Sequence, residues 1–229
     1  MLLAIDTATH AIGAAVHDGR DVRARVVRED ARKHAELLTP AIEEALRQAG
    51  LHRDQLTAVV CGVGPGPFTG LRVGVVTAQV LAHALGLPAP QGICSLDALA
   101  HAVRDRHQGE LLVATDARRK EVYWARYRVD QGRATRVAGP GVARAADLPR
   151  EVRELPVVGR GALLYPDALP HLLPDGPRDV DPGELADLAV RLRAGAHPDE
   201  DAALLPPEPL YLRRPDAVAP AGMPTSGEG

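Results

Sequence analysis

Residues 111–116, LLVATD, decide the fold because they repeat a pattern already present in LLAIDT at residues 2–7. Each segment is a short apolar run with an aspartate at its end, Asp116 in one case and Asp6 in the other. Short apolar runs of this kind are typical of buried strands. We therefore expect a duplicated unit, each copy beginning with a buried strand that ends in an acidic residue.

The segments that follow the two runs repeat as well. Turn dipeptides at Asp18-Gly19 and Gln131-Gly132 each separate two strand-like stretches, which indicates a hairpin in each copy. Further on, the VVGRG of residues 157–161 resembles the VCGVG of residues 60–64. A strand meander followed by helix and strand, present twice, predicts two related α/β lobes.

This repeat divides the chain into three parts. We expect an N-terminal lobe over residues 1–108 and a smaller C-terminal lobe over residues 109–214. Residues 215–229 consist mainly of Pro, Ala, Gly, Ser and charged residues, and we expect a disordered tail there.

Composition limits the functions that the chain can have. Of its 229 residues, 45% are apolar and only 3% aromatic, so the core must be built from aliphatic side chains. The net charge is -3, and no basic stripe interleaved with aromatic residues is present, which argues against tight, direct nucleic-acid binding by this chain alone. Membrane-length apolar runs and a secretion signal are also missing. With Cys61 and Cys94 in strand-like segments, we expect reduced, buried thiols and a cytoplasmic protein.

The glycine-rich loop at residues 64–70, GPGPFTG, joins a predicted strand to a predicted helix. Glycines before a helix N-terminus allow backbone amides to bind a phosphate. However, Leu71-Arg72 stands where a P-loop needs Gly-Lys-Ser/Thr, and a tight strand-to-helix turn explains the glycines equally well. If the nucleotide interpretation holds, the residues involved are Asp6, Thr7, Gly64, Gly66, Thr69, Gly70 and Asp116.

Two long helices are predicted in the N-terminal lobe. The first carries apolar residues from 38 to 49 and begins at Pro40 or, kinked at Pro40, near Arg32. The second, over about residues 70–85, is apolar on almost every side. Such a helix is either buried within its own lobe or packed against another protein, and the pattern leaves both interpretations open.

The sequence lacks the common motifs of metal-dependent and serine-nucleophile enzymes. The nine histidines include no HxxxH or HExxH pair, so a zinc or iron site is not expected. A GxSxG nucleophile elbow is absent too.

Several motifs together resemble one family, the TsaB (YeaZ) proteins of tRNA threonylcarbamoyl-adenosine biosynthesis. The most specific are the glycine loop, continued to Gly74 as LRVG, and DARRKEVY at residues 116–123. The other matching segments are IDT at residues 5–7, HAELLTPAI at 34–42, SLDALA at 95–100 and PLYLR at 209–213.

This resemblance implies a two-lobed, actin-like ATPase (ribonuclease H-like) α/β fold and a non-catalytic subunit without a cofactor of its own. Its partner would be TsaD, which carries the catalytic site, together with the ATPase TsaE. The complex would transfer threonylcarbamoyl from its adenylate to the adenosine 3′ of the tRNA anticodon. On this interpretation tRNA is bound through the complex rather than directly, ATP or ADP would bind at the partner interface, and the free chain could be a homodimer.

The resemblance also implies that the first two helices dock on TsaD. The residues expected at that interface are Glu36, Leu38, Ile42, Leu46, Leu71, Arg72, Val75, Ala78, Leu81 and Ala82.

Two departures from related sequences bear on activity. Pro67 stands where relatives often carry serine, which weakens the case for strong nucleotide binding by the loop. Leu96 and Ala100 occupy the places of the metal-binding histidine pair of TsaD-like subunits, and neither side chain can ligate a metal. A metallopeptidase is therefore not expected. The remaining rival is an independent ATP-dependent phosphotransferase or ATPase that uses Asp6, Asp116 and the glycine loop.

Overall fold

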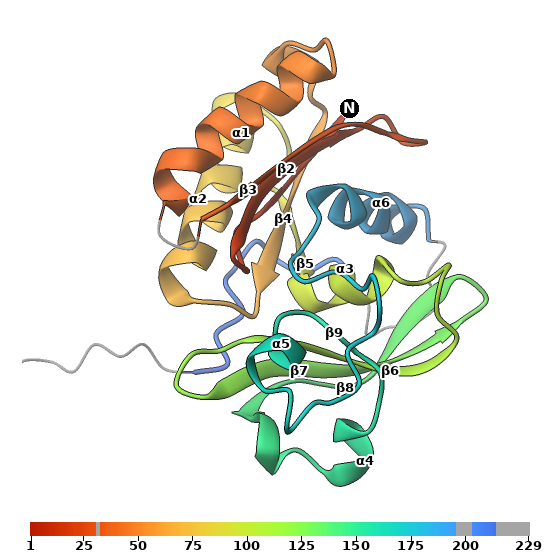
Figure 1. Ribbon diagram of the computed structural model, residues 1–229. Helices are drawn as coiled ribbons and strands as arrows, with labels where there is room; N and C mark the ends of the chain where they lie inside the picture. The colour runs from red at the N-terminus through yellow and green to blue at the C-terminus, as the bar shows by residue number, and fades with distance from the viewer. Residues whose placement is uncertain (31–32, 196–202, 214–229) are drawn as a thin grey trace, which may run out of the picture.

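Two mixed β-sheets form the framework of the computed structural model, which describes residues 1–30, 33–195 and 203–213 (Figure 1). The first sheet has the order β3-β2-β1-β4-β5. Its strands are β1 (Leu2–Asp6), β2 (Ala11–His17), β3 (Val22–Glu29), β4 (Ala58–Gly64) and β5 (Gln91–Cys94). The second has the order β8-β7-β6-β9, from β6 (Gly109–Asp116), β7 (Glu121–Asp130), β8 (Arg133–Arg144) and β9 (Val157–Val158).

The strand pairings confirm the predicted duplication and with it the two-lobed, actin-like fold class. In the first sheet β1 and β2 pair antiparallel, as do β2 and β3, and β4 pairs parallel to β1. In the second sheet β6, β7 and β8 form the same antiparallel meander, and β9 lies parallel to β6. Asp6 and Asp116 thus end equivalent strands.

Three helices cover the first sheet. Helices α1 (His34–Gln48) and α2 (Phe68–Ala84) pack on one face, and α6 (Pro182–Arg193) packs on the other (Figure 1). Helix α1 therefore begins before Pro40 and contains it. The shorter helices are α3 (Ser95–His101), α4 (Arg150–Arg153) and α5 (Gly161–Leu164), with 3-10 turns at Arg53–Gln55 and Ala145–Asp147.

Alternation along the strands divides the apolar residues between two cores. In β1, Leu3 and Ile5 face the core under α1 and α2, whereas Leu2 and Ala4 face the opposite side. That opposite core also contains Tyr127 of β7. The two lobes therefore share a continuous core where they meet.

Helix α6 corrects the predicted domain boundaries. The boundary at residue 109 separates the two sheets, but α6, assigned by sequence to the 109–214 lobe, packs against β1, β2 and β3. Its apolar face, which includes Leu185 and Leu188, belongs to the shared core with Leu2. The order of segments in the sequence does not show that the chain returns to the first sheet after it has formed the second. The predicted tail, residues 215–229, lies outside the described residues.

Both cysteines lie in the first sheet and are buried as free thiols. Burial, and after it the charge of Asp6, raises the pKa of the Cys61 thiol to about 12, so this thiol is unreactive. Within the described ranges of the chain, no helix combines the length and apolar character needed to cross a bilayer.

Candidate functional site

The glycine loop packs against the segment that follows β1. A Cβ atom placed on Gly66 would lie 2.4 Å from the carbonyl oxygen of Ala8, and one on Gly70 would lie 2.6 Å from that of Thr7. The Thr7 hydroxyl donates a hydrogen bond of 2.8 Å to the Gly70 carbonyl. These glycines are thus explained by the close approach of two backbone segments.

Asp6 lies at the centre of this contact and is 1% exposed. Ser95 Oγ donates to its Oδ2 at 2.7 Å, and the Ala8 amide donates to its Oδ1 at 2.9 Å. Ser95 Oγ also accepts from the Gly64 amide at 3.2 Å. Burial raises the pKa of Asp6 to about 6, against the opposing effect of the hydrogen bonds from Ser95 and Ala8. Asp6 therefore joins three segments of the first lobe and has both oxygens engaged.

Replacing Asp6 with asparagine is expected to stabilise the chain at neutral pH. Because the pKa of Asp6 rises from 3.8 to about 6 on folding, the folded state binds the proton more tightly. Wild-type stability should thus fall as pH rises from about 4 to about 6, by about 3 kcal/mol, and stay lower at higher pH. Urea unfolding of wild type and Asp6→Asn across this pH range measures the effect. An unchanged pH dependence in Asp6→Asn would contradict the assignment.

Asp116 lies in the second lobe, across the lobe junction from Asp6. Its carboxylate contacts Arg118 in the turn that follows β6. Its Oδ1 accepts from the Arg118 amide at 2.7 Å, and its Oδ2 lies 3.2 Å from Arg118 Nη1. The cavity beside it, also lined by Thr9, Arg160 and Asp179, has a volume of about 10 Å³, on the order of a single water molecule. The structure therefore gathers Asp6, Thr7, Gly64, Gly66 and Gly70 into one packed cluster, with Thr69 exposed beside it.

The residues predicted to form the partner interface lie mostly in the core. Only Glu36 and Arg72 are exposed, and Leu81 is half-buried. The prediction is wrong for the others, which pack against the first sheet inside their own lobe: Leu38, Ile42, Leu46, Leu71, Val75, Ala78 and Ala82.

A different set of apolar residues on α2 reaches the surface. Phe68, Val76 and Val80 are 39%, 48% and 61% exposed. With Arg72 they recur every four residues along one side of α2, away from the buried residues that contact the sheet. Because α2 is apolar on nearly every side, its sequence pattern did not distinguish the outer stripe from the inner one. We call Arg72, Val76 and Val80 the α2 outer stripe.

Sequence reasoning missed the role of Asp97. Its carboxylate accepts two hydrogen bonds from Arg136 of β8, from Nε at 3.0 Å and from Nη2 at 2.9 Å, and one from the Tyr127 hydroxyl at 2.7 Å. Burial, and next the charge of Asp97, raises the pKa of Tyr127 well above its usual value, so Tyr127 remains a donor. Asp97 therefore connects α3 of the first lobe to the second sheet. The SLDALA segment at residues 95–100, which contains Asp97, was the sequence feature that could have pointed to this role.

The two positions at which TsaD-like subunits carry a histidine pair lie in the core of this chain. Leu96 and Ala100 are both 0% exposed and pack in the core that the lobes share. They leave no donor atom for a metal.

One cluster in the described part of the chain has the spacing of a metal site. His101, Glu184 and Asp187 place possible ligand atoms within 4.8 Å of one another. Arg104, however, lies 2.6 Å from the Glu184 carboxylate and 3.2 Å from that of Asp187. Its guanidinium already compensates both negative charges, so the cluster is best described as an ion-pair network between α3 and α6.

Comparisons with known proteins identify relatives of most of the chain. The family described as TsaD, tRNA N6-adenosine threonylcarbamoyltransferase, matches residues 24–158. An uncharacterized protein of Mycobacterium leprae is 44% identical over 221 residues, 95% of this chain and 56% of that protein. The tRNA threonylcarbamoyladenosine biosynthesis protein TsaB of Haemophilus influenzae is 40% identical over 126 residues, 54% of this chain and 52% of that protein. The chain thus spans about half the length of these curated relatives.

A solved structure resembles the whole arrangement. YeaZ from Pseudomonas aeruginosa superimposes with a TM-score of 0.76 at 29% identity and covers 92% of this chain and 99% of its own. The similarity therefore extends over both lobes.

Proposed function

The chain belongs to the TsaB (YeaZ) family and carries a domain of the TsaD type, and on this premise we propose that it is a non-catalytic subunit that docks on a catalytic TsaD subunit. In this role it supports the transfer of threonylcarbamoyl from its adenylate to the adenosine 3′ of the tRNA anticodon. The observation that carries the proposal is the exposed α2 outer stripe. It occurs in a chain whose relatives include tRNA threonylcarbamoyladenosine biosynthesis proteins.

The geometry of the cleft supports a non-catalytic role. Both oxygens of Asp6 are occupied by protein donors, and Thr7 bonds to the glycine loop. The cavity beside Asp116 admits about one water molecule rather than a nucleotide. An ATPase of this fold would need an open cleft between its lobes. This favours the partner role over the independent phosphotransferase or ATPase.

The α2 outer stripe supports docking through this helix. Val76 and Val80 are large apolar side chains on an element whose inner side already completes the core. Exposed apolar residues that gather along one helix, rather than singly, mark interaction surfaces. Arg72, a member of the stripe, adds an exposed charge to such a contact.

We extend the proposal to the rest of the complex. A TsaE-like ATPase completes it, ATP or ADP binds where subunits meet rather than in this chain, and the free chain uses the same stripe to form a homodimer. In this scheme the chain itself holds no cofactor.

Reconstitution of the reaction tests this role. The chain alone is expected to give no threonylcarbamoyl-adenosine when supplied with threonylcarbamoyl adenylate and tRNA. The TsaD homologue and the TsaE homologue of the same genome should give product at a rate at least 10-fold higher when the chain is added. Product analysis by mass spectrometry of digested tRNA provides the readout. Turnover by the isolated chain, or no stimulation of the TsaD and TsaE homologues, would refute the proposal.

A further inference from the structure

We propose that a cationic pocket at the end of α2 binds a single-stranded segment of RNA, through its phosphate backbone and one base. The inference rests on the proposed function, which brings the chain to an RNA substrate, and it assigns to this chain a direct contact with that substrate. The pocket has a volume of about 180 Å³. We call it the arginine pocket, and its main lining residues are Gly66, Phe68, Arg118, Arg119, Tyr211 and Arg213.

Cationic side chains converge here from segments far apart in the sequence. Arg118 and Arg119 come from the turn between β6 and β7, and Arg213 comes from the C-terminal segment, where it pairs with Glu121 and donates to the Ala117 carbonyl. In Figure 1 this turn lies below the N-terminal end of α2, beside residues 203–213. The fold thus brings three arginines together at one pocket, although the chain as a whole has a net charge of -3.

Two aromatic rings form the apolar part of the pocket. Phe68 and Tyr211 stack with centroids 5.1 Å apart and an interplanar angle of 26°. Arg72 lies over the Phe68 ring, with Cζ 5.3 Å from its centroid. Phe68 is 39% exposed and Tyr211 is 42% exposed, so ring surface remains available to a further planar group. Exposed rings beside arginines are the combination on which single-stranded nucleic acids stack.

The N-terminal end of α2 adds backbone donors. Pro67 is the N-cap residue, and its side chain has no atom that could accept a cap hydrogen bond. The first helical bond recorded at this end runs from the Leu71 amide to the Pro67 carbonyl. The preceding amides of α2 thus lie at the positive end of the helix dipole, beside the arginines.

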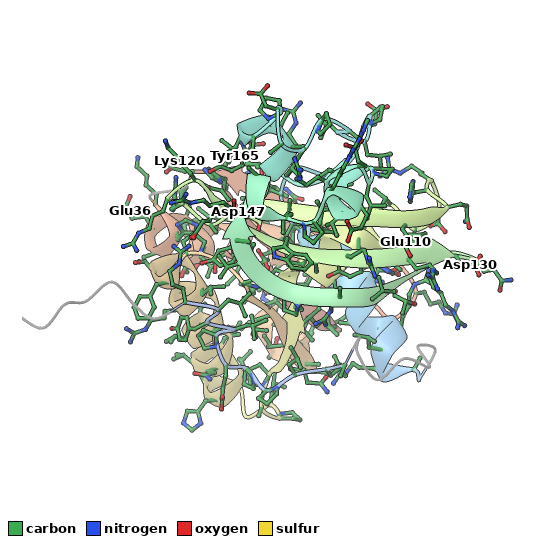
Figure 2. The ribbon with its side chains drawn as sticks, turned by 90° about the horizontal axis from the view of Figure 1, so that it is seen from below. Glu36, Glu110, Lys120, Asp130, Asp147 and Tyr165 are labelled. Atoms are coloured by element: carbon green, nitrogen blue, oxygen red, sulfur yellow. The ribbon has the colours of Figure 1, made fainter. Side chains whose placement is uncertain are left out.

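An unusual backbone holds the arginines in place. Arg118, Arg119 and Lys120 have φ values of 60°, 54° and 63°, three successive non-glycine residues in the left-handed region. This conformation disfavours a side chain by about 1 kcal/mol per residue. Glycine would fit this turn better, so a change to glycine at these positions should not destabilise the fold. Figure 2 shows Lys120 at the same end of the molecule as Glu36 of α1, with Glu110 and Asp130 at the opposite end.

The size of the arginine pocket favours a strand over a free nucleotide. Pockets that enclose a small molecule usually measure about 300–1,000 Å³, and this one is smaller. It can hold a phosphate with part of a base while the rest of the ligand continues over the surface. Lys120, which is exposed on the same turn, extends the positive region along such a path.

The test uses Arg118→Gly/Arg119→Gly, which removes both cations and relieves the left-handed backbone. We expect its melting temperature to equal or exceed that of wild type, while its affinity for a tRNA transcript in low salt falls about 10-fold. The slope of log K against log salt should decrease by about 2, one for each lost phosphate contact. Tyr211→Ala should lower affinity roughly 5- to 150-fold through lost stacking. Arg128→Ala/Arg133→Ala, with the same loss of charge at the opposite end, is the control and should bind like wild type.

Fluorescence anisotropy with labelled tRNA should be recorded on the isolated chain and on its mixture with the TsaD homologue. The inference is supported if the pocket variants, and not the control, lose affinity in the isolated chain, even if no complex with TsaD forms. It is overturned if the isolated chain does not bind tRNA at low salt, or if pocket and control variants bind equally. Displacement of the RNA from the isolated chain by an equimolar amount of ATP would also overturn it, because the pocket would then be a free-nucleotide site.

Discussion

Asp97→Ala is expected to lower the free energy of unfolding by about 3–5 kcal/mol, a loss typical of breaking a buried ion pair from one side. Asp97 is 6% exposed and accepts from both Arg136 and Tyr127. Its removal takes away the acceptor that the Arg136 guanidinium and the Tyr127 hydroxyl share at the junction of the lobes. Urea or thermal unfolding followed by circular dichroism measures the loss.

Two comparisons separate this effect from a general loss of packing. Tyr127→Phe removes a single hydrogen bond to Asp97 and should cost about 1 kcal/mol. Asp97→Ala combined with Arg136→Met should recover part of the stability, because the guanidinium that faced Asp97 is then absent. An Asp97→Ala chain as stable as wild type would contradict the view that Asp97 joins the lobes.

Val80→Glu is expected to leave the chain folded and to weaken binding to the TsaD homologue by at least 100-fold. Val80 is 61% exposed in the free chain, so glutamate is tolerated there. In a complex that buries the α2 outer stripe, the same carboxylate would lose its water without gaining a partner, which costs several kcal/mol. Isothermal titration of the TsaD homologue with each variant gives the affinity.

Two valines serve as controls for this prediction. Val75→Glu puts the charge one turn away on the inner side of α2, where the side chain is 2% exposed, so this variant should unfold rather than dock poorly. Val137 is 36% exposed on β8 of the second lobe, and Val137→Glu should bind TsaD like wild type. Equal binding by Val80→Glu and Val137→Glu would place the interface elsewhere.

The sequence predicted the fold well because the duplicated elements are local patterns. The apolar run before Asp6 and its counterpart before Asp116 are strands by composition, and the turns at Asp18-Gly19 and Gln131-Gly132 join the strands of two hairpins. The path of α6 was not predictable in the same way. Its amphipathic pattern indicates a helix, but not which of two sheets it covers.

The site was predicted less well because burial around α2 depends on tertiary packing. Val75 and Val76 are neighbours of identical chemistry, yet one is buried and the other 48% exposed. The glycine loop was compatible with a phosphate site and with a tight turn, and only the structure shows that Ala8 and Thr7 approach Gly66 and Gly70 so closely that a side chain there would clash. The arginine pocket was missed because its cations and aromatic rings are distant along the chain.

The central claim, docking on TsaD through α2, is tested most directly by the mass of the assembled particle. Light scattering after size exclusion should show a stable complex for the wild-type chain mixed with the TsaD homologue, and separate components for Val80→Glu. If wild type and the TsaD homologue elute as separate components with and without TsaE and ATP, the claim is contradicted.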